Sequence, residues 1–400
     1  MSSALSGIRV LDLTNVLAGP LCAYQLALLG AEVVTVEVPD GGDLARQLGA
    51  DPALNARHMG ASFLAQNAGK KSLTLNLKSA KGKEVLHRLV ATADVLVENF
   101  RPGVMARLGV SYDELKQTNP KLVYCAISGF GQEGPMRGAP AYDQIIQGLS
   151  GIMSITGTPE AAPLRVGYPV ADTLAGMMAA FAISSALVRR NATGEGGFID
   201  VSMLDSALTA MGWVVSNYLI AGVEPQAHGN DNITSAPSGA FKTRNGLINI
   251  AANKQEQFVA LVALLGREDL ASDARFAQRE NRKRNRAALT TEIESVLVTR
   301  DSAEWERELN RIGVPGGSVL SVPQALALPQ VQQRDFLKTF EHADGLDGPL
   351  TVSRTGFKLS GGNPDVHTPP PQLGQHTDEF LQSVGYSAQE ISGFREEGVI

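Results

Sequence analysis

Short apolar runs alternate with longer amphipathic segments over the first third of the chain. The short runs predict strands and the longer segments predict helices. The expected strands are 8–13, 31–38, 72–77, 95–98 and 122–128, and the expected helices are 18–29, 81–91 and 112–118. Strands that alternate with helices form mostly parallel sheets with helices on both faces. We therefore predict an α/β fold whose large domain holds a Rossmann-like, mostly parallel sheet.

The pattern changes after Val223. Two short segments, 239–243 and 247–252, flank an Arg-Asn-Gly turn and predict a hairpin. Further helices are expected at 255–265, 286–298 and 302–312, and a last one from Thr377. We predict a large domain that starts with 1–205, a linker helix at 206–224, a smaller α+β domain at 225–320, and a return segment at 321–400 that completes the large domain. The prolines at 369–371 fit an extended strap across a surface.

One carboxylate, Asp172, stands at the start of a long apolar segment with no basic side chain beside it. Apolar residues follow it at helical spacing: Leu174, Met177, Met178, Phe181, Leu187 and Val188. Asp172 is therefore expected at the N-cap or in the first turn of a buried helix. Such a carboxylate either caps the helix or serves as a nucleophile that the helix N-terminus keeps ionised.

Composition narrows the possible functions. The 400 residues are 44% hydrophobic, with a formal net charge of −6, which gives no support to binding of nucleic acid or anionic membranes. Cys22, Cys125 and six scattered histidines form no metal-ligand spacing. With no signal peptide at the first residues, we expect a cytoplasmic protein. The uncharged stretch 206–223 is interrupted by polar residues and is expected as a buried or interface helix, not a membrane span.

Three common catalytic motifs are missing. The turn after the first strand, 14–20, has no G-x-G-x-x-G, which excludes a dinucleotide dehydrogenase. No G-x-S-x-G motif supports a serine hydrolase. The Gly-Lys-Lys-Ser at 69–72 lacks the glycine and spacer of a phosphate-binding loop.

Basic residues lie near strand ends, where α/β proteins bind ligands. Lys70 and Lys71 precede one expected strand, while Asn99, Arg101 and Arg107 follow another. The latter three either converge on a phosphorylated ligand, with Phe100 stacking beside it, or belong to a solvated loop. The basic run 279–286 is expected as a solvated helix face or as the lead-in to a helix.

The sequence resembles the family III CoA-transferases over nearly its whole length. The marks, in chain order, are Val-Leu-Asp at 10–12, Ala-Gly-Pro at 18–20, and the segments 29–33, 97–103, 128–135, 171–172 and 373–378. The resemblance implies a homodimer of two interlocked, ring-like chains. It also implies acyl-CoA and a free carboxylic acid as substrates. We expect no tightly bound cofactor and no metal and, from the composition, no nucleic-acid or membrane partner.

The resemblance also implies roles for single residues. Asp172 matches the nucleophilic aspartate. The residues that match the CoA-contacting segments are Leu75, Asn76, Leu77, Lys78, Asn99, Phe100, Arg101 and Arg107. Those that match the segment beside the thioester are Ala141, Tyr142 and Asp143. The wall of the same site is matched by Val16, Leu17 and Ala18. The implied reaction passes through an aspartyl anhydride and an aspartyl-CoA thioester.

Departures from the family pattern bear on the substrate. Formyl-CoA transferases carry glutamine at the position of Leu17 and arginine at that of Val38, and 228–237 replaces their glycine loop. A formyl or oxalyl substrate is therefore not expected, although this loop still suits a lid. Two interpretations of Arg165 and His228 stay open. One of them pairs with the distal carboxylate of an acceptor that is a small dicarboxylic acid, or both are surface residues.

Two other functions stay open on the sequence. The α-methylacyl-CoA racemases share the fold but carry a His-Asp pair at the position of Tyr142 and Asp143, and tyrosine is a poor base at neutral pH. A non-catalytic CoA-binding protein is the third interpretation. The presence of Asp172 favours the transferase over both.

Overall fold

The computed structural model describes residues 3–400. These residues form two compact units. The first contains the chain up to Ile152, Arg165–Val223 and Gln332–Ile400, and the second contains Met153–Leu164 and Glu224–Val331. Whether these units behave as the domains expected from the sequence stays a prediction.

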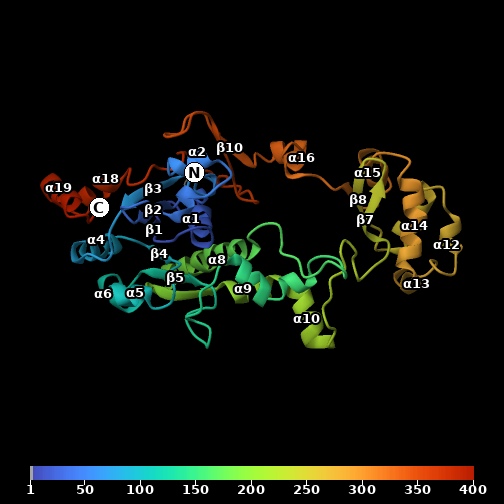
Figure 1. The fold of residues 1–400 in the computed structure, drawn as a ribbon, viewed down its shortest axis with the longest axis horizontal. Helices are drawn as coiled ribbons and strands as arrows, with labels where there is room; N and C mark the ends of the chain where they lie inside the picture. Colours follow the sequence, from blue (N-terminus) through green and yellow to red (C-terminus); the bar gives the residue numbers. More distant parts are fainter. Residues whose placement is uncertain (1–2) are drawn as a thin grey trace. The chain divides into compact units, whose positions relative to one another are not determined.

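The first unit is built on a six-stranded parallel sheet (Figure 1). Its strands are β1 (Arg9–Asp12), β2 (Glu32–Glu37), β3 (Lys70–Thr74), β4 (Val95–Glu98), β5 (Val123–Ser128) and β6 (Gly197–Ser202), in the order β3-β2-β1-β4-β5-β6. This order confirms the expected Rossmann-like sheet. Successive strands are added toward one edge from β1 to β3 and toward the other edge from β4 to β6, so the strand order reverses between β1 and β4. Open α/β sheets bind ligands at such a reversal, beyond the carboxyl ends of the strands.

Helices cover both faces of this sheet, and alternate strand residues face the two cores. Val10 of β1 packs in one hydrophobic cluster with α1 (Ala18–Leu28) and α8 (Val170–Thr193). Its neighbour Leu11 packs in the other with α4 (Ala80–Val90), α6 (Tyr112–Thr118), α18 (Thr377–Ser383) and α19 (Ala388–Glu396). This two-residue alternation is the period of a strand.

The first unit also contains shorter elements. Its short helices are η1 (Leu44–Gln47), α2 (Pro52–Ala56), α3 (Ala61–Leu64), α5 (Val104–Leu108), α7 (Asp143–Leu149), α9 (Met203–Ala210) and α10 (Gly212–Ala221). Strands β10 (Leu337–Phe340) and β11 (Leu350–Ser353) form a hairpin. Two further helices, η2 (Ile152–Ile155) and α17 (Pro329–Gln333), lie at the boundaries between the units in the sequence.

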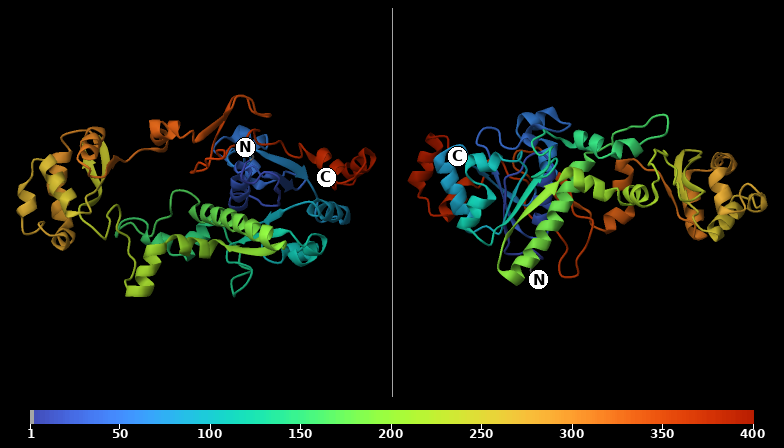
Figure 2. Two further views of the ribbon diagram at one scale, coloured as in Figure 1. Left: turned by 180° about the vertical axis from the view of Figure 1, so that it is seen from behind. Right: turned by 90° about the horizontal axis from the view of Figure 1, so that it is seen from below.

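The C-terminal segment packs along the N-terminal part of the sheet, as the red and blue ribbons in both views of Figure 2 show. The Asn76 backbone N–H donates to the Val399 carbonyl at 2.8 Å. Arg46 is buried, donates to the Pro371 carbonyl at 3.3 Å and pairs with Glu37 at 2.6 Å. The proline run is thus attached to the sheet by a buried ion pair.

Helix α8 differs from the expected buried helix. The side it packs against α1 carries small residues, among them Ala175, Gly176 and Ala179, which are fully buried or nearly so. Phe181 and Val188 instead stay about seven-tenths exposed, at 69% and 71%. Ile183 and Leu187 are buried as expected, so α8 has one buried face and one face with exposed large apolar side chains.

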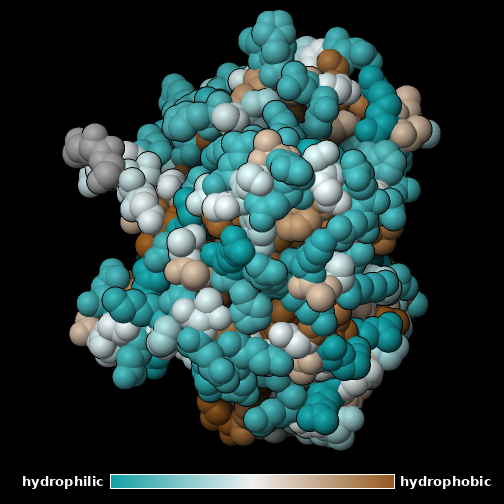
Figure 3. Space-filling view, turned by 90° about the vertical axis from the view of Figure 1, so that its left-hand side faces the viewer, coloured by the Kyte–Doolittle hydropathy of each residue, from teal (hydrophilic) through white to brown (hydrophobic). Residues whose placement is uncertain are grey.

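Two apolar segments bear on the question of a membrane. The stretch 206–223 is broken at Met211 and Gly212 into α9 and α10, neither long enough to cross a bilayer. Within the described residues, α8 alone is long and apolar enough to span one by length and composition, and 44% of its apolar window is buried in the protein. A core helix of a soluble protein has the same properties. On the face drawn in Figure 3, hydrophilic residues predominate and hydrophobic ones form small groups.

The second unit is a small α+β structure, as predicted. Strands β7 (Ser238–Thr243), β8 (Gly246–Ala251) and β9 (Gly316–Ser318) form an antiparallel sheet. The helices are α11 (Gln255–Leu264), α12 (Asp269–Ser272), α13 (Arg279–Arg284), α14 (Arg286–Leu297), α15 (Ser302–Arg311) and α16 (Val322–Leu326). Phe241, Phe258 and Trp305 lie in its core.

The basic run 279–286 is not the solvated face that its charge predicts. Arg282 is buried, donates to the Ala236 carbonyl at 2.8 Å and lies over the Phe258 ring. Arg286 donates to the carbonyls of Asn232 and Ser235, at 2.7 Å each. These guanidinium groups donate hydrogen bonds to backbone carbonyls of the loop before β7. The carbonyls lie some 50 residues away in the sequence, so the run's own pattern does not predict these bonds.

Candidate active site

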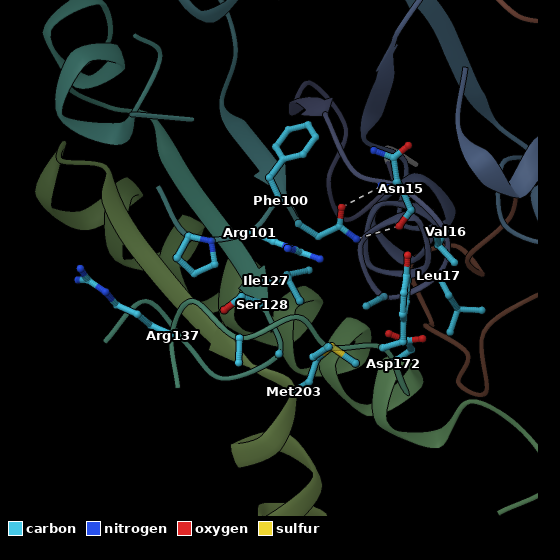
Figure 4. Close-up of a pocket in the computed structure, with 17 residues that line it drawn as sticks. Asn15, Val16, Leu17, Phe100, Arg101, Ile127, Ser128, Arg137, Asp172 and Met203 are labelled. Carbon is cyan, nitrogen blue, oxygen red and sulfur yellow. Dashed lines mark hydrogen bonds between the residues drawn. The ribbon is translucent and has the colours of Figure 1, made fainter. Parts of the chain in front are cut away.

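A cavity opens at the carboxyl ends of β1, β4 and β5, beside the reversal of strand order (Figure 4). The first residues of α1 and α9, the first turn of α8 and the loop before α7 complete it. Its lining residues are Asn15, Val16, Leu17, Ala18, Asn99, Phe100, Arg101, Pro102, Ile127, Ser128, Gly129, Arg137, Ala139, Ala141, Tyr142, Asp172 and Met203.

The cavity brings together most of the residues that the sequence singled out. Asp172 shares it with the segments 16–18, 99–101 and 141–142. Asp143 lies directly behind Asp172, whereas Arg107 and Leu75, Asn76, Leu77 and Lys78 do not line it. Asn76 is bonded to the backbone of Gly398 and Val399. The CoA-contacting roles of these residues stay predictions.

Sequence reasoning missed Arg137 and Met203. Met203 is the first residue of α9, directly after β6, a strand that the sequence analysis also missed. Arg137 lies in an exposed loop that carries no regular pattern. Only the nearby 128–135 segment, a mark of the family resemblance, pointed to this region.

Asp172 is the third residue of α8, but it does not cap the helix. The backbone N–H groups of Ala171 and Asp172 donate to Oδ1 of Asp143, at 2.8 and 3.4 Å. Asp143 itself is buried and accepts a further hydrogen bond from Gln147 at 2.6 Å. The Asp172 carboxylate has no hydrogen bond within the described residues and faces the cavity. Asp143 therefore supplies the cap of α8 and Asp172 does not, whereas the role of Asp172 as a nucleophile stays a prediction.

The electrostatics of Asp172 differ from expectation. Burial, and secondarily the charge of Asp143, raise the pKa of Asp172 to about 7. The expectation that the helix N-terminus keeps this carboxylate fully ionised at neutral pH is therefore wrong for the free chain. Burial is the larger cause of the raised pKa and the charge of Asp143 the smaller one, and the N–H groups at the start of α8 donate to Asp143 instead of to the Asp172 carboxylate. Arg165 lies 3.9 Å from Asp143 and does not reach Asp172 by an ion pair.

Asn99 holds the opposite wall of the cavity. Its amide accepts from the Asn15 N–H at 2.9 Å and donates to the Asn15 carbonyl at 2.8 Å. Next to it, buried Glu98 accepts from the Phe100 N–H at 2.8 Å, and burial raises the pKa of Glu98 to about 7. The loop after β4 is thereby fixed against the loop after β1.

Helices α1 and α8 approach closely at the cavity. A Cβ atom on Gly176 would lie 2.5 Å from the Ala18 carbonyl oxygen, a distance that real Cβ contacts do not reach. Gly176 follows Asp172 by one helical turn. The absence of a side chain at this position therefore lets Asp172 lie beside Leu17 and Ala18.

The basic residues of the region have separate roles. Arg101 and Arg137 line the cavity, are exposed, and form no ion pair within the described residues. Lys70, considered above as a strand-end cation, is fully buried and pairs with Asp12 at 2.9 Å. Lys71 pairs with Glu32 and Glu379 at the surface. Lys70 and Lys71 thus stabilise the sheet, while Arg101 and Arg137 remain open to an anionic ligand.

The described residues form no candidate metal site, and both of their cysteine thiols are buried. No group of three or more His, Cys, Asp or Glu side chains could hold a metal ion among residues 3–400. Cys22 and Cys125 are buried free thiols, and burial raises the pKa of both.

Comparison with known proteins identifies the family. The model of CoA-transferase family III matches residues 5–377. The chain belongs to CoA-transferase family III. The succinate–glutarate CoA-transferase of Agrobacterium fabrum is 36% identical over 392 residues, which cover 94% of each chain. The acetyl-CoA:oxalate CoA-transferase of Acetobacter aceti is 40% identical over 83% of this chain and 84% of its own length.

A solved structure supports the fold of this family III chain. The CaiB/BaiF family protein of Brucella suis superimposes with a TM-score of 0.84 and 34% identity, over 96% of this chain and all of the other. The α/β fold with a parallel sheet and the enzyme class, both inferred from the sequence, are confirmed, whereas the interlocked dimer stays a prediction. The chain is a CoA-transferase. Among the described residues that line the cavity, Asp172 is the only carboxylate, and it accepts no hydrogen bond within the described residues.

Proposed function

We propose that this family III enzyme moves CoA from an acyl-CoA donor to a small dicarboxylic acid, with Asp172 as the nucleophile. One observation carries the proposal. Asp143 takes the N–H groups at the start of α8, so the Asp172 carboxylate faces the cavity without a structural partner. A nucleophilic carboxylate needs no general base, unlike a serine hydroxyl.

The proposed reaction has two symmetrical halves. The Asp172 carboxylate attacks the thioester carbonyl, the C–S bond breaks, and CoA thiolate leaves a mixed anhydride on the enzyme. The thiolate then attacks the aspartyl carbonyl and releases the donor acid, which leaves an aspartyl-CoA thioester. The acceptor carboxylate attacks the carbonyl of that thioester, the C–S bond breaks, and CoA thiolate is released as a second anhydride forms. The thiolate finally attacks the acyl carbonyl of this anhydride, which yields the new acyl-CoA and free Asp172.

The start of α1 supports the oxyanions of these steps. Leu17 and Ala18 line the cavity, and no side chain caps α1. Backbone N–H groups directed at a developing oxyanion are worth about 3 kcal/mol each in other acyl-transfer enzymes. The loop 228–237 belongs to the second unit, and its role as a lid stays a proposal.

Arg101 and Arg137 are proposed to bind the phosphates of CoA. Replacing both with alanine should raise KM for the acyl-CoA by roughly ten- to a hundredfold and weaken its salt dependence, because two unpaired cations of the cavity are lost. The kcat at saturating donor should change little, since neither residue is proposed to contact the reacting carbonyl. Steady-state kinetics at two salt concentrations measures both effects, and Arg311→Ala, at an exposed helix site of the second unit, is the control. An unchanged KM would remove the two arginines from the binding site.

The reaction should lose rate in acid, because only the ionised Asp172 is nucleophilic. With the pKa of Asp172 at about 7, kcat/KM for the donor is expected to rise up to about pH 7 and to level off above it. Asp143→Asn keeps an oxygen for the α8 N–H groups but removes the adjacent charge, so its profile should move to lower pH. A profile without an ionisation in this range would contradict the assignment.

The acceptor is supported by relatives and remains to be identified. Relatives of this chain are named for glutarate, oxalate and mesaconate, which are all dicarboxylates. The oxalate relative also weakens the expectation that an oxalyl substrate is excluded. Arg165, whose guanidinium lies near Asp143, is a candidate partner for the distal carboxylate; His228 belongs to the second unit.

A panel experiment tests the proposed function. The enzyme is incubated with succinyl-CoA and one acid at a time (glutarate, oxalate, mesaconate, and acetate as a monocarboxylate), and new CoA thioesters are detected by mass spectrometry. We expect transfer to at least one dicarboxylate and little to acetate. Absence of transfer to every acid, with CoA binding retained, would favour a binding protein.

The racemase alternative is tested by incubating the enzyme with an α-methyl-branched acyl-CoA in deuterated water, without an acceptor acid. The structure disfavours it, because buried Asp143 is committed to α8 and Gln147, and Tyr142 is 70% exposed. Deuterium at the α-carbon of a branched acyl-CoA would overturn the transferase assignment.

We propose that the enzyme is a cytoplasmic homodimer. Exposed apolar side chains on α8 and α10 support the dimer. They include Phe181, Val188, Trp213 and Ile220, and a second copy would cover them. Interlocking of the two chains is carried over from the family resemblance.

A further inference from the structure

Val16 has an unusual backbone conformation. Its φ angle is +69°, in the left-handed region that a β-branched residue rarely adopts. Val16 lies at the end of the loop after β1 and lines the cavity. Such strain persists only where surrounding contacts impose it.

Three polar side chains supply these contacts. Asp43 is buried and accepts the Val16 N–H at 2.9 Å. Gln66, also buried, donates to the Val16 carbonyl at 3.0 Å. Asn99 holds the preceding residue by both ends of its amide. The peptide groups on either side of Val16 are thus held by residues from three separate segments of the chain.

The position of Asp43 is fixed by a hydrogen bond to Glu37 at the end of β2. Its backbone N–H donates to Glu37 Oε1 at 3.0 Å. Glu37 in turn forms the buried ion pair with Arg46, at 2.6 Å. The strained residue is therefore connected through Asp43 to the carboxyl end of β2, a rigid part of the sheet.

The conformation of Val16 determines what lies next to Asp172. Leu17 and Ala18 follow directly, line the cavity with Asp172, and begin α1. The Ala18 carbonyl is also the group that Gly176 of α8 approaches most closely. If Val16 relaxed to an ordinary conformation, the chain would enter α1 in another direction and the wall beside Asp172 would move.

We propose that Asp43 is a positioning residue for the transfer reaction: by holding Val16 in the left-handed conformation, it places Leu17 and Ala18 against Asp172. The proposal rests on the proposed function of Asp172. Asp43 contacts neither the cavity nor the reacting atoms, so its effect is exerted through the backbone of Val16.

The test compares three variants. Asp43→Ala removes the acceptor, and kcat should fall by about 10- to 100-fold, the cost of a misplacement of about 1 Å in other active sites, with KM for the acyl-CoA within about twofold. Asp43→Asn keeps an oxygen that accepts the same N–H groups and should retain most of the activity. Asp51→Ala is the matched control, because Asp51 caps the next helix in the same way as Asp43 caps η1, but does not touch Val16.

Hydrogen exchange of the peptide that contains residues 13–20 gives a second readout, independent of turnover. It should be faster in Asp43→Ala than in the wild type, Asp43→Asn and Asp51→Ala. Unchanged exchange in Asp43→Ala would overturn the proposed hold on Val16. Faster exchange with an unchanged kcat would overturn the positioning role alone, as would equal losses in Asp43→Ala and Asp51→Ala. A wild-type enzyme that transfers CoA to no acid would instead refute the proposed function, and the positioning role with it.

Discussion

Replacing Asp172 with alanine is expected to lower CoA transfer by about 10³-fold or more, the scale seen when a covalent enzyme loses its nucleophile. The carboxylate has no hydrogen bond among the described residues, and α8 keeps its cap from Asp143. The variant should therefore fold normally and bind CoA with nearly unchanged affinity. Transfer rates, together with calorimetric titration of CoA, measure the two expectations.

Asp205→Ala is the matched control for Asp172→Ala. Asp205 is likewise the third residue of its helix, α9, but it is exposed and lies outside the cavity. Its replacement should leave transfer unchanged. If Asp172→Ala retained more than about a tenth of wild-type activity, Asp172 would not be the nucleophile.

The raised pKa of Asp172 also gives Asp172→Asn a stability effect of defined sign. The folded pKa, about 7, exceeds the unfolded value of about 3.9, so ionisation destabilises the folded chain as pH rises between these values. The variant, which cannot ionise, should therefore gain stability relative to the wild type from about pH 4 to about pH 7, with a constant difference above. Urea unfolding across this range shows the trend.

Replacing Lys70 with methionine should destabilise the first unit by about 3–5 kcal/mol, since it leaves a buried carboxylate without its partner. Neither Lys70 nor Asp12 has an exposed side chain, and Lys70 also donates to the Pro20 carbonyl in α1 at 2.9 Å. Urea unfolding at pH 7 measures the loss. The Lys70→Met, Asp12→Asn double variant should recover part of it, because no buried charge remains.

The neighbouring residue provides a control for this second expectation. Lys71 also lies in β3 and also pairs with carboxylates, but its side chain is about one-third exposed. Lys71→Met should cost about 1 kcal/mol or less, as solvent-exposed pairs usually do. Equal losses in the two variants would mean that the buried pair has no special weight.

Much of the fold follows from local patterns. Apolar runs such as 95–98 and 122–128 are strands because buried parallel strands are apolar on both faces, and their structural bounds differ from the expected ones by a residue or less. β3 begins at Lys70, two residues earlier than expected, because Asp12 and the Pro20 carbonyl satisfy a lysine inside the sheet. β6 was missed, as its alternating burial resembles no continuous apolar run.

The candidate site was predictable in its residues more than in its interactions. Asp172 was found from its position at the start of an apolar helix, but the cap from Asp143 joins residues 28 positions apart. Asp43 and Gln66 carried no signal, because nothing local reveals that Val16 adopts a positive φ. Similarly, the role of Arg282 depends on the carbonyl of Ala236. Contacts of this kind arise from the tertiary fold and not from sequence periodicity.

The most direct test of the account is the mass of the peptide that contains residue 172. The enzyme is mixed with succinyl-CoA in the absence of an acceptor, quenched in acid and digested. We predict a CoA adduct on Asp172 that disappears when the acceptor acid is added before the quench. Continued CoA transfer with residue 172 unmodified, or an adduct on another residue, would contradict the proposed role of Asp172.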